Sequence, residues 1–591
     1  MSDQAASPRD RVRGMGVLLI VVVLLTSAAV LARIVQLQAH PSPQLLEYAG
    51  DVTSQQRELG RRGALLDREG RTLAVSLIGQ RLFVDPKLVR DPAFLAEELH
   101  RLAGFPPAET LSKLEQAPEG ARYVVISHLL ADEQALALQQ ECPRGAGLQA
   151  RLVREYPHGD LAAALVGKVG FEHEGRLGAE LTFDETLRGQ EGRLVYTRDA
   201  SRQALWVEPG RHETAAAGGI VQLSIDIVIQ RLVEEELQKA VQAANAGGGR
   251  AVVVEPSTGE LLAMTDILWT PERDEAWAPH TTDPQREAHP ALGRFRCVTD
   301  IYEPGSTFKV FMWAVMTELG LAHIEETLDC HQGAWRVPYA RRVLHDAFPK
   351  DELTWHEVLV HSSNIGMGQI AERMTPRQMQ QAVRRFGFGR KTNIGLPGET
   401  AGIVTSPASW TRFTQTSVAM GQEIAVTPIQ LARAFCSFAR RGADKGTLPF
   451  LRLTKAPPDE AAPPRVRVLP PAVVDQAIAA MAEVGERLNQ KLTRQDVEFS
   501  RHKLYGKSGT AQLPNWTEGG YYDDRYVSSF VAAAPLDEPR LVVLVVIDDP
   551  DRTSEAGHYG SSVAGPAVRA IVDRTLEYLG VPEPAEDESS I

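Results

Sequence analysis

The hydrophobic pattern of the chain begins with one long apolar run. Residues 14–32 carry no charged side chain. At about 1.5 Å of rise per helical residue, they reach roughly across the ~30 Å hydrocarbon core of a bilayer. Three arginines lie between positions 9 and 13, and the positive-inside tendency keeps such residues in the cytoplasm. We therefore expect a cytoplasmic tail (1–13) and a transmembrane helix (14–35), with the rest of the chain outside the cytoplasm.

A cleaved signal peptide is the alternative interpretation of this run. Residues 30–32 offer small side chains at plausible cleavage positions after an apolar core. However, the run is longer than the ~7 to 15 residues typical of a signal-peptide core, and Ile34 and Val35 extend it. This length favours a retained anchor. Nowhere else in the sequence is there a segment long and uncharged enough to span a bilayer.

After the anchor, short apolar segments alternate with glycines. Residues 81–84 and 123–126 have the pattern of strands, and residues 132–140 have the pattern of a helix. Together they predict an irregular, elongated α+β domain over residues 36–215. A glycine-rich break at 215–219 marks the boundary of this domain.

The second half of the chain combines one amphipathic helix, two hairpins and a long helical middle. Residues 229–243 carry apolar side chains at spacings of three and four, which is typical of a helix. The hairpin patterns occupy 250–254 with 260–264, and 528–533 with 541–547. They predict a central antiparallel sheet with helices on both faces, within a domain over residues 216–582. Residues 583–591 are interpreted as a flexible acidic tail.

Composition excludes several classes of function. The 591 residues suffice for two or three domains. The 76 acidic and 63 basic residues give a net charge of -13 and no overall cationic surface for nucleic acid. The cysteines are far apart and the histidines lack ligand spacing, so we expect no disulfide, metal or cofactor. The cysteines are Cys142, Cys297, Cys330 and Cys436.

Three short motifs carry candidate chemistry, in a fixed order. They are S-x-x-K at 306–309, S-x-N at 362–364 and K-S-G-T at 507–510. If Ser306 begins a helix, the Lys309 amine lies on the same face and can reach the serine hydroxyl. A serine needs such a base, and an apolar environment lowers the pKa of a lysine enough to provide one. A second S-x-x-K at 500–503 lies in a charged stretch and shows that this motif alone is weak.

The other two motifs supply the remaining groups of a cleft. We expect residues 355–360 to form a helix that ends at 364–366. Ser362 could then pass a proton between Lys309 and an amine, while Asn364 holds a peptide group of the substrate.

The K-S-G-T segment is expected to bind the substrate. A cationic Lys507 and the hydroxyls of Ser508 and Thr510 could bind a carboxylate, and Gly509 would let the substrate lie against a strand edge. The backbone N–H groups of Ser306 and Thr510 would form an oxyanion hole. Each motif alone has a structural explanation, as a helix cap, a helix stop or a solvated strand end. The three in order favour a catalytic site.

This arrangement resembles the class B penicillin-binding proteins. Residues 62–74 are similar to the family's R-G-x-I-x-D-R-x-G-x-x-L-A box, and residues 175–192 to its second pedestal box. The segments 302–309, 421–428 and 559–566 extend the resemblance towards the C-terminus. The chain departs from the family at Leu65 and Leu66, which change the usual isoleucine spacing, and at Ser508, where threonine is common.

The resemblance implies a monofunctional peptidoglycan D,D-transpeptidase of the division (septal) type. It implies a non-catalytic pedestal followed by a transpeptidase domain of β-lactamase-like fold. Ser306 would attack the penultimate D-alanine carbonyl of a stem peptide, release D-alanine and pass the acyl group to an amine; β-lactams would acylate the same serine. The implied partners are the membrane, a membrane-embedded glycosyltransferase and cell-division proteins. The implied location is the cytoplasmic (inner) membrane, with the catalytic domain on the periplasmic side.

Three alternatives remain at this point. A D,D-carboxypeptidase or a β-lactam-hydrolysing enzyme would share the three motifs, although the pedestal boxes and the anchor favour a synthase. A catalytically silent division scaffold has no need to retain all the reactive groups. A bifunctional glycosyltransferase is disfavoured because residues 36–215 lack an acidic glycosyltransferase box. The 62–74 box either serves an interface or fixes a local turn.

Overall fold

The structure is a computed structural model in which most of the chain can be described. The described residues are 8–40, 42–43, 53–198, 204–269, 271, 293–338, 342–457, 464–515 and 518–584. Residues 1–7 of the expected cytoplasmic tail and 585–591 of the expected acidic tail lie outside them. The chain forms two compact units, one of Met1–Arg61 with Gly189–Ala217 and the other of Arg62–Arg188 with Gly218–Ile591.

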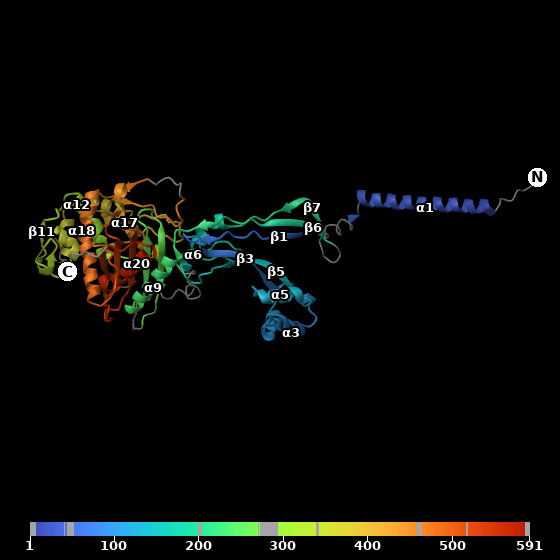
Figure 1. Cartoon of the computed structure of the whole chain (residues 1–591), viewed down its shortest axis with the longest axis horizontal. Helices are drawn as coiled ribbons and strands as arrows, with labels where there is room; N and C mark the ends of the chain where they lie inside the picture. The colour runs from blue at the N-terminus through green and yellow to red at the C-terminus, as the bar shows by residue number, and fades with distance from the viewer. Residues whose placement is uncertain are drawn as a thin grey trace, which may run out of the picture. The chain divides into compact units, whose positions relative to one another are not determined.

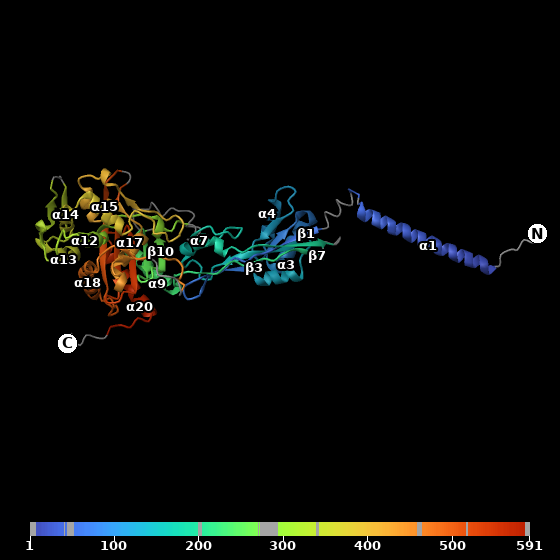
Figure 2. The ribbon, with the colours of Figure 1, turned by 90° about the horizontal axis from the view of Figure 1, so that it is seen from above.

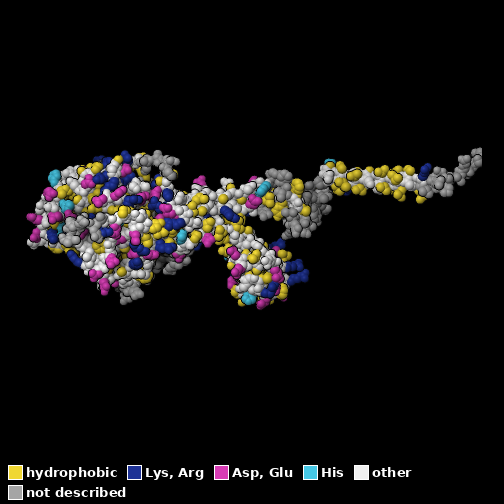
Figure 3. All heavy atoms as spheres, in the orientation of Figure 1, with side chains coloured by type: hydrophobic (Ala, Val, Ile, Leu, Met, Phe, Trp, Pro, Cys, Tyr) yellow, Lys and Arg dark blue, Asp and Glu magenta, His cyan; other side chains and the backbone are white. Residues whose placement is uncertain are grey.

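The first unit begins with helix α1 (Pro8–Ala39), which contains the predicted span. Residues Arg13–Ala39 are long and apolar enough to cross a membrane. The apolar side chains are exposed around the helix, as at Leu18 (64%) and Leu24 (63%), and they form a nearly continuous hydrophobic surface in Figure 3. A helix packed on a soluble protein would bury one apolar stripe instead. This exposure fits an anchor surrounded by lipid.

The rest of the first unit is a three-stranded antiparallel sheet. Its order is β1 (Thr53–Glu58), β6 (Gly192–Arg198) and β7 (Ala204–Glu213). Strands from two distant parts of the sequence thus pair with one another.

The second unit opens with a smaller α+β part, as the sequence predicts. Strand β3 (Thr72–Val84) pairs antiparallel with β4 (Val124–Ser127) and β5 (Ala146–Glu155). Leu82 and Val84 of β3 pack with leucines of the helices in a small separate core. These helices are α3 (Pro92–Ala103), α4 (Pro107–Glu115) and α5 (Asp132–Gln140). The predicted helix over 132–140 is confirmed; the predicted strand 81–84 lies in β3, and the predicted strand 123–126 matches β4 with a shift of one residue.

The predicted central antiparallel sheet is also confirmed, with five strands in the order β10-β9-β21-β20-β19. Their bounds are β9 (Gly248–Val254), β10 (Leu261–Leu268), β19 (Tyr505–Pro514), β20 (Tyr521–Ala534) and β21 (Leu541–Asp548). Every residue of β21 is buried, because helices cover both faces of the sheet (Figure 1). Val542 and Leu544 pack into one core, and Val543 and Val545 into the other. Side chains that alternate along a strand thereby serve both layers.

The covering helices come from widely separated parts of the sequence. One core contains α12 (Lys309–Glu318) and α17 (Pro428–Ala439), and the other contains α9 (Ile227–Ala243) and α20 (Gly565–Tyr578). The predicted helix over 229–243 therefore matches α9. All four cysteines are free thiols, and three of them are buried.

The remaining elements are mostly short. The helices and turns are η1 (Pro86–Leu88), α6 (Ala163–Val166), α7 (Gly178–Thr182), α8 (Asp184–Leu187), α11 (Arg296–Thr299), η3 (Gly305–Phe308), η4 (His331–Gly333), α13 (Trp355–His361), α14 (Asn364–Ala371), α15 (Pro376–Arg385), η5 (Pro407–Ser409), α16 (Thr414–Ala419), η6 (Gly442–Asp444), α18 (Pro471–Thr493) and α19 (Gly560–Val563). The strands are β2 (Leu65–Leu66), β8 (Val221–Gln222), β11 (Thr327–Asp329), β12 (Ala334–Arg336), β13 (Val343–His345), β14 (Glu352–Thr354), β15 (Ile403–Val404), β16 (Ile424–Ala425), β17 (Thr447–Leu448) and β18 (Val466–Arg467).

The helix that precedes the second motif ends earlier than the sequence predicts. Helix α13 ends at His361, and Ser362 adopts the left-handed conformation with φ 59°. Asn364 then begins α14, where Ser363 accepts a hydrogen bond from the Gly366 N–H at 3.0 Å. The expectation that 364–366 stop a helix was therefore wrong, because Ser363 acts as an N-cap. Helices α12, α13 and α14 lie together in Figure 2.

Candidate active site

Ser306 lies in a turn that is fixed to two other segments of the chain. It belongs to the 3-10 turn η3, which leads directly into the buried helix α12. Tyr302 and Val426 exchange two backbone hydrogen bonds of 2.9 Å, and the Gly305 N–H donates to the Gly421 carbonyl at 2.9 Å. Gly305 has φ 54°, which favours glycine. Ser306 thus opens onto a cleft of 820 Å³.

Lys309 is the most deeply buried of the predicted catalytic groups. Its side chain is fully buried, and its Nζ donates to the Ser362 carbonyl at 2.5 Å and to Asn364 Oδ1 at 2.7 Å. Burial lowers the pKa of Lys309 to about 7, against the opposing effect of the Asp346 carboxylate. Ser306 Oγ makes no hydrogen bond to a residue that the structure describes. A neutral amine is therefore available near neutral pH one helical turn after Ser306, although the two side chains are not hydrogen-bonded to each other here.

The Ser362 hydroxyl lies between two lysines. Lys507 Nζ donates to Ser362 Oγ at 2.9 Å, and Lys309 Nζ lies 3.4 Å from the same oxygen. Lys507 is only 1% exposed, which contradicts the structural explanation of this residue as a solvated strand end. Burial and the nearby charge of Lys309 together hold the pKa of Lys507 well below its usual value. The second and third motifs meet at one hydroxyl.

Asp346 holds the second motif in place, and no sequence motif pointed to it. Its Oδ2 accepts a hydrogen bond from Ser363 Oγ at 2.6 Å, and its Oδ1 accepts from the backbone N–H groups of Asn364 and Ile365. Asp346 also lines the cleft. A carboxylate at the start of α14 satisfies N–H groups that have no partner within the helix. The negative charge of Asp346 also favours the protonated form of Lys309 and so offsets part of the effect of burial on its pKa.

Strand β19 presents its residues alternately to the cleft and to the protein interior. Ser508 and Thr510 line the cleft, and Thr510 Oγ1 accepts a hydrogen bond from the Gly560 N–H at 3.0 Å. Gly509 also borders it, but a Cβ built there would lie 2.8 Å from the Pro304 carbonyl oxygen and 2.9 Å from Thr307. The missing side chain thus allows close contact with the Ser306 turn, a different reason from the substrate contact expected from sequence.

Several other residues line the cleft. They include Arg342, Gln422, Lys491, Gln512, Tyr526, His558 and Tyr559. Gln422 and Tyr559 fall in segments that carry the family resemblance, whereas the others had no motif spacing to identify them. Ser500, from the second S-x-x-K sequence, does not line the cleft; its hydroxyl donates to Asp573.

Known proteins match the chain over both halves. The penicillin binding protein transpeptidase domain matches residues 249–573, and the penicillin-binding protein dimerisation domain matches residues 57–223. The probable peptidoglycan D,D-transpeptidase PbpC of Pseudomonas aeruginosa is 30% identical over 576 residues, which cover 96% of this chain and 95% of that protein. The peptidoglycan D,D-transpeptidase FtsI of Escherichia coli strain K12 is 30% identical over 567 residues, covering 95% and 91%. A peptidoglycan synthetase from Bifidobacterium adolescentis is a structural neighbour with a TM-score of 0.66 and 25% identity, covering 91% and 99%.

Proposed function

Because the chain belongs to the class B penicillin-binding proteins, we propose that its transpeptidase reaction takes place at Ser306. The enzyme is a peptidoglycan D,D-transpeptidase. The observation that carries the assignment of Ser306 is the position of Lys309. Its amine is buried one helical turn away, has a pKa of about 7 and is hydrogen-bonded to Asn364 and the Ser362 carbonyl.

Acylation follows from these groups. Ser306 Oγ attacks the carbonyl carbon of the penultimate D-alanine while its proton passes to the neutral amine of Lys309. The backbone N–H groups of Ser306 and Thr510 donate to the resulting oxyanion. The peptide bond then breaks, and the departing D-alanine nitrogen takes up a proton from Lys309 through the Ser362 hydroxyl. This relay uses the hydroxyl that both lysines contact.

Substrate binding uses the third motif and Asn364. The terminal carboxylate lies against the hydroxyls of Ser508 and Thr510, with Lys507 behind them. An approaching carboxylate favours the protonated form of this lysine and thereby offsets the effect of burial on its pKa. The Asn364 amide holds a peptide group of the stem peptide. We retain Gly509 in the substrate-binding strand, where its main effect is the close approach of β19 to the Ser306 turn.

The second half-reaction transfers the acyl group. An amine from a neighbouring stem peptide attacks the carbonyl carbon of the Ser306 ester and loses its proton to the Ser362–Lys309 pair. The acyl C–O bond then breaks, and the Ser306 oxygen takes up a proton from Lys309. A β-lactam acylates the same oxygen by ring opening. Its amide nitrogen stays tethered, so that no leaving group departs.

Fluorescent penicillin labelling tests the nucleophile. Ser306→Ala should abolish covalent labelling, whereas Ser500→Ala should retain it, because Ser500 lies outside the cleft. Persistent labelling of Ser306→Ala would rule out this assignment. Incubation with a pentapeptide donor and an amine acceptor then separates transfer from hydrolysis. A cross-linked product supports the transpeptidase, and a tetrapeptide formed by hydrolysis alone would favour a D,D-carboxypeptidase.

The topology and the partners are proposals of the same kind. We assign residues 1–13 to the cytoplasm, 14–35 to the membrane, 36–215 to a pedestal and 216–582 to the periplasmic transpeptidase domain. Septal synthesis beside a membrane-embedded glycosyltransferase and division proteins is the proposed setting. Protease added to spheroplasts should digest the chain beyond the anchor and spare its N-terminus. A free mature form starting near Arg33 would instead support a cleaved signal peptide.

A further inference from the structure

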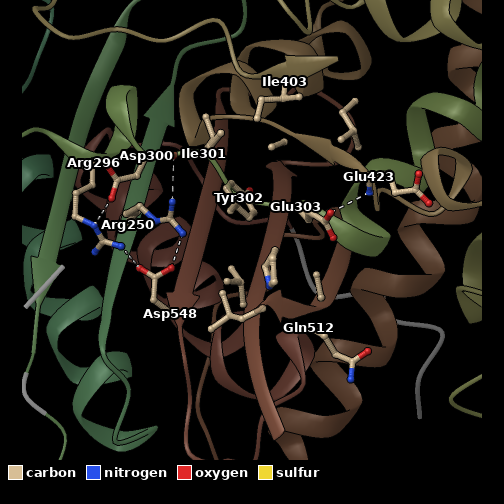
Figure 4. A pocket seen from close by; sticks show the side chains of 16 residues that line it. Arg250, Arg296, Asp300, Ile301, Tyr302, Glu303, Ile403, Glu423, Gln512 and Asp548 are labelled. Carbon is tan, nitrogen blue, oxygen red and sulfur yellow. Dashed lines mark hydrogen bonds and ion pairs between the residues drawn. The ribbon is translucent and has the colours of Figure 1, made fainter. Parts of the chain in front are cut away.

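A second cavity lies on the face of β19 that points away from the Ser306 cleft. It has a volume of 260 Å³, and Ala511 and Leu513 line it, whereas Ser508 and Thr510 line the cleft. Gln512 borders both. We call this second cavity the β19 pocket; Figure 4 shows the side chains around it. Its size is near the lower limit of small-molecule sites.

The middle of the β19 pocket is apolar. The apolar side chains come from five segments of the chain and include Ile301, Ile403, Ile424, Leu513, Pro514 and Val527. They would cover the body of a small ligand and exclude water from it. A ligand with little apolar surface would gain nothing from such walls.

One end of the pocket holds charges that already neutralise each other. Arg250 and Arg296 both pair with Asp548, and Arg296 also pairs with Asp300 at 3.1 Å (Figure 4). Arg250 also lies 4.8 Å from the ring centre of Tyr302. Because two carboxylates match the two arginines, this end does not favour an additional anion.

The other end holds the carboxylate of Glu303, whereas the carboxylate of Glu423 points away from Glu303 (Figure 4) and accepts a hydrogen bond of 2.6 Å from the Thr414 hydroxyl. Glu303 accepts hydrogen bonds of 3.0 Å from the Tyr521 hydroxyl and from the Glu423 N–H. Neither glutamate forms an ion pair with a residue that the structure describes. Burial, assisted by the charge of Glu423, raises the pKa of Glu303 to about 7. Tyr521 from β20 and Glu423 from the loop before β16 are the titratable groups that contact Glu303.

Tyr302 supplies a polar group between the two ends. Its side chain is 6% exposed and lines the pocket, and its hydroxyl has no hydrogen-bond partner among the described residues. In Figure 4 this side chain lies between Arg250 and Glu303. A buried hydroxyl without a partner is costly, and a bound N–H group would satisfy it.

We propose that the β19 pocket binds a small organic cation with an apolar body, whose charged N–H groups lie against Glu303. The apolar body occupies the space between Ile403, Ile424 and Val527. The class of ligand is an aryl amidine or a short arylalkyl ammonium ion. Since Glu303 lies three residues before Ser306, the ligand would touch the segment that carries the nucleophile.

Three probes of the same shape test the charge. Benzamidinium, benzamide and benzoate carry one ring and differ in charge, and each can be titrated into protein whose Ser306 has first been acylated with penicillin, so that the cleft is occupied. Isothermal calorimetry should detect benzamidinium with a Kd of about 1 to 10 mM, weaker binding of benzamide and none of benzoate. Binding of benzoate as tight as that of benzamidinium would overturn the proposal.

The dependence on pH and on Glu303 completes the test. If the ionised form of Glu303 binds the cation, benzamidinium affinity should rise about tenfold between pH 6 and pH 8. Glu303→Gln should weaken binding and remove this pH dependence. Glu577→Gln removes an equal charge from an exposed site on α20 and should leave the benzamidinium affinity and its pH dependence unchanged. Wild-type affinity in Glu303→Gln, or no saturable benzamidinium binding to the wild-type protein, would refute the site.

Discussion

The role of Asp346 gives the sharpest prediction about the catalytic groups. Asp346→Asn removes one negative charge and keeps a side-chain oxygen that can accept from the N–H groups of Asn364 and Ile365. The new amide can donate to Ser363 Oγ, which the native carboxylate contacts at 2.6 Å. The start of α14 should therefore survive, while Lys309 loses the carboxylate that favours its charged form.

The size of the effect follows from the pKa of Lys309. In the wild-type enzyme this pKa is about 7, so acylation should rise with pH and level off above about pH 8. Loss of the Asp346 charge should lower the pKa of Lys309 by about one unit, which corresponds to about 1.4 kcal/mol, and the rise in acylation rate should then occur about one pH unit lower. The neutral fraction at pH 6 then increases from about one tenth to about one half. Because the amine is then a weaker base, the acylation rate at the high-pH plateau should fall about threefold.

Stopped-flow acylation by a chromogenic cephalosporin between pH 5.5 and pH 9 measures both effects. The variant should be slower than the wild-type enzyme at pH 8 and equally fast or faster at pH 6. Asp351→Asn, at an exposed neighbouring position, should leave the profile unchanged. A uniform loss of rate with an unmoved profile would mean that Asp346 acts only on the geometry. A move towards alkaline pH would refute the neutral amine of Lys309 as the base.

Three further predictions concern packing and cooperation between groups. Gly509→Ala should separate β19 from the Ser306 turn, because its Cβ would lie 2.8 Å from a carbonyl oxygen of that turn. Penicillin labelling should show at least a tenfold slower acylation, and chemical denaturation a loss of about 1 to 3 kcal/mol of stability. Arg62→Ala leaves the buried carboxylate of Glu180 with one arginine fewer, so the free energy of unfolding should fall by about 3 to 5 kcal/mol. Unchanged stability together with failed division would support an interface instead. Lys309→Ala should lose nearly as much acylation as Ser306→Ala, and the double variant should be no slower, because the two act as a unit.

The sheet was predictable because its signal is local. Runs such as 541–547 are apolar without interruption, and a strand with this pattern must be covered on both faces. Turn residues between the paired runs then specify hairpins, as at 256–259. Only one of the two partners of β9, its hairpin partner β10, could be derived in this way. Strand β9 also pairs with β21, from the far end of the chain, and only tertiary contacts decide such a pairing.

The site was predictable as a set of groups but not as an electrostatic arrangement. The spacing of Ser306 and Lys309 predicts a nucleophile with its base because residues three apart share a helix face. No spacing could place Lys507 beside the Ser362 hydroxyl, since a strand and a helix terminus bring them together. Burial changes the chemistry of this lysine as well, because two ammonium groups at one hydroxyl cannot both keep their charge at low cost. The proposed proton relay would therefore depend on a substrate carboxylate that stabilises charge on Lys507 and leaves Lys309 neutral, a coupling that becomes apparent only when both amines are located in space.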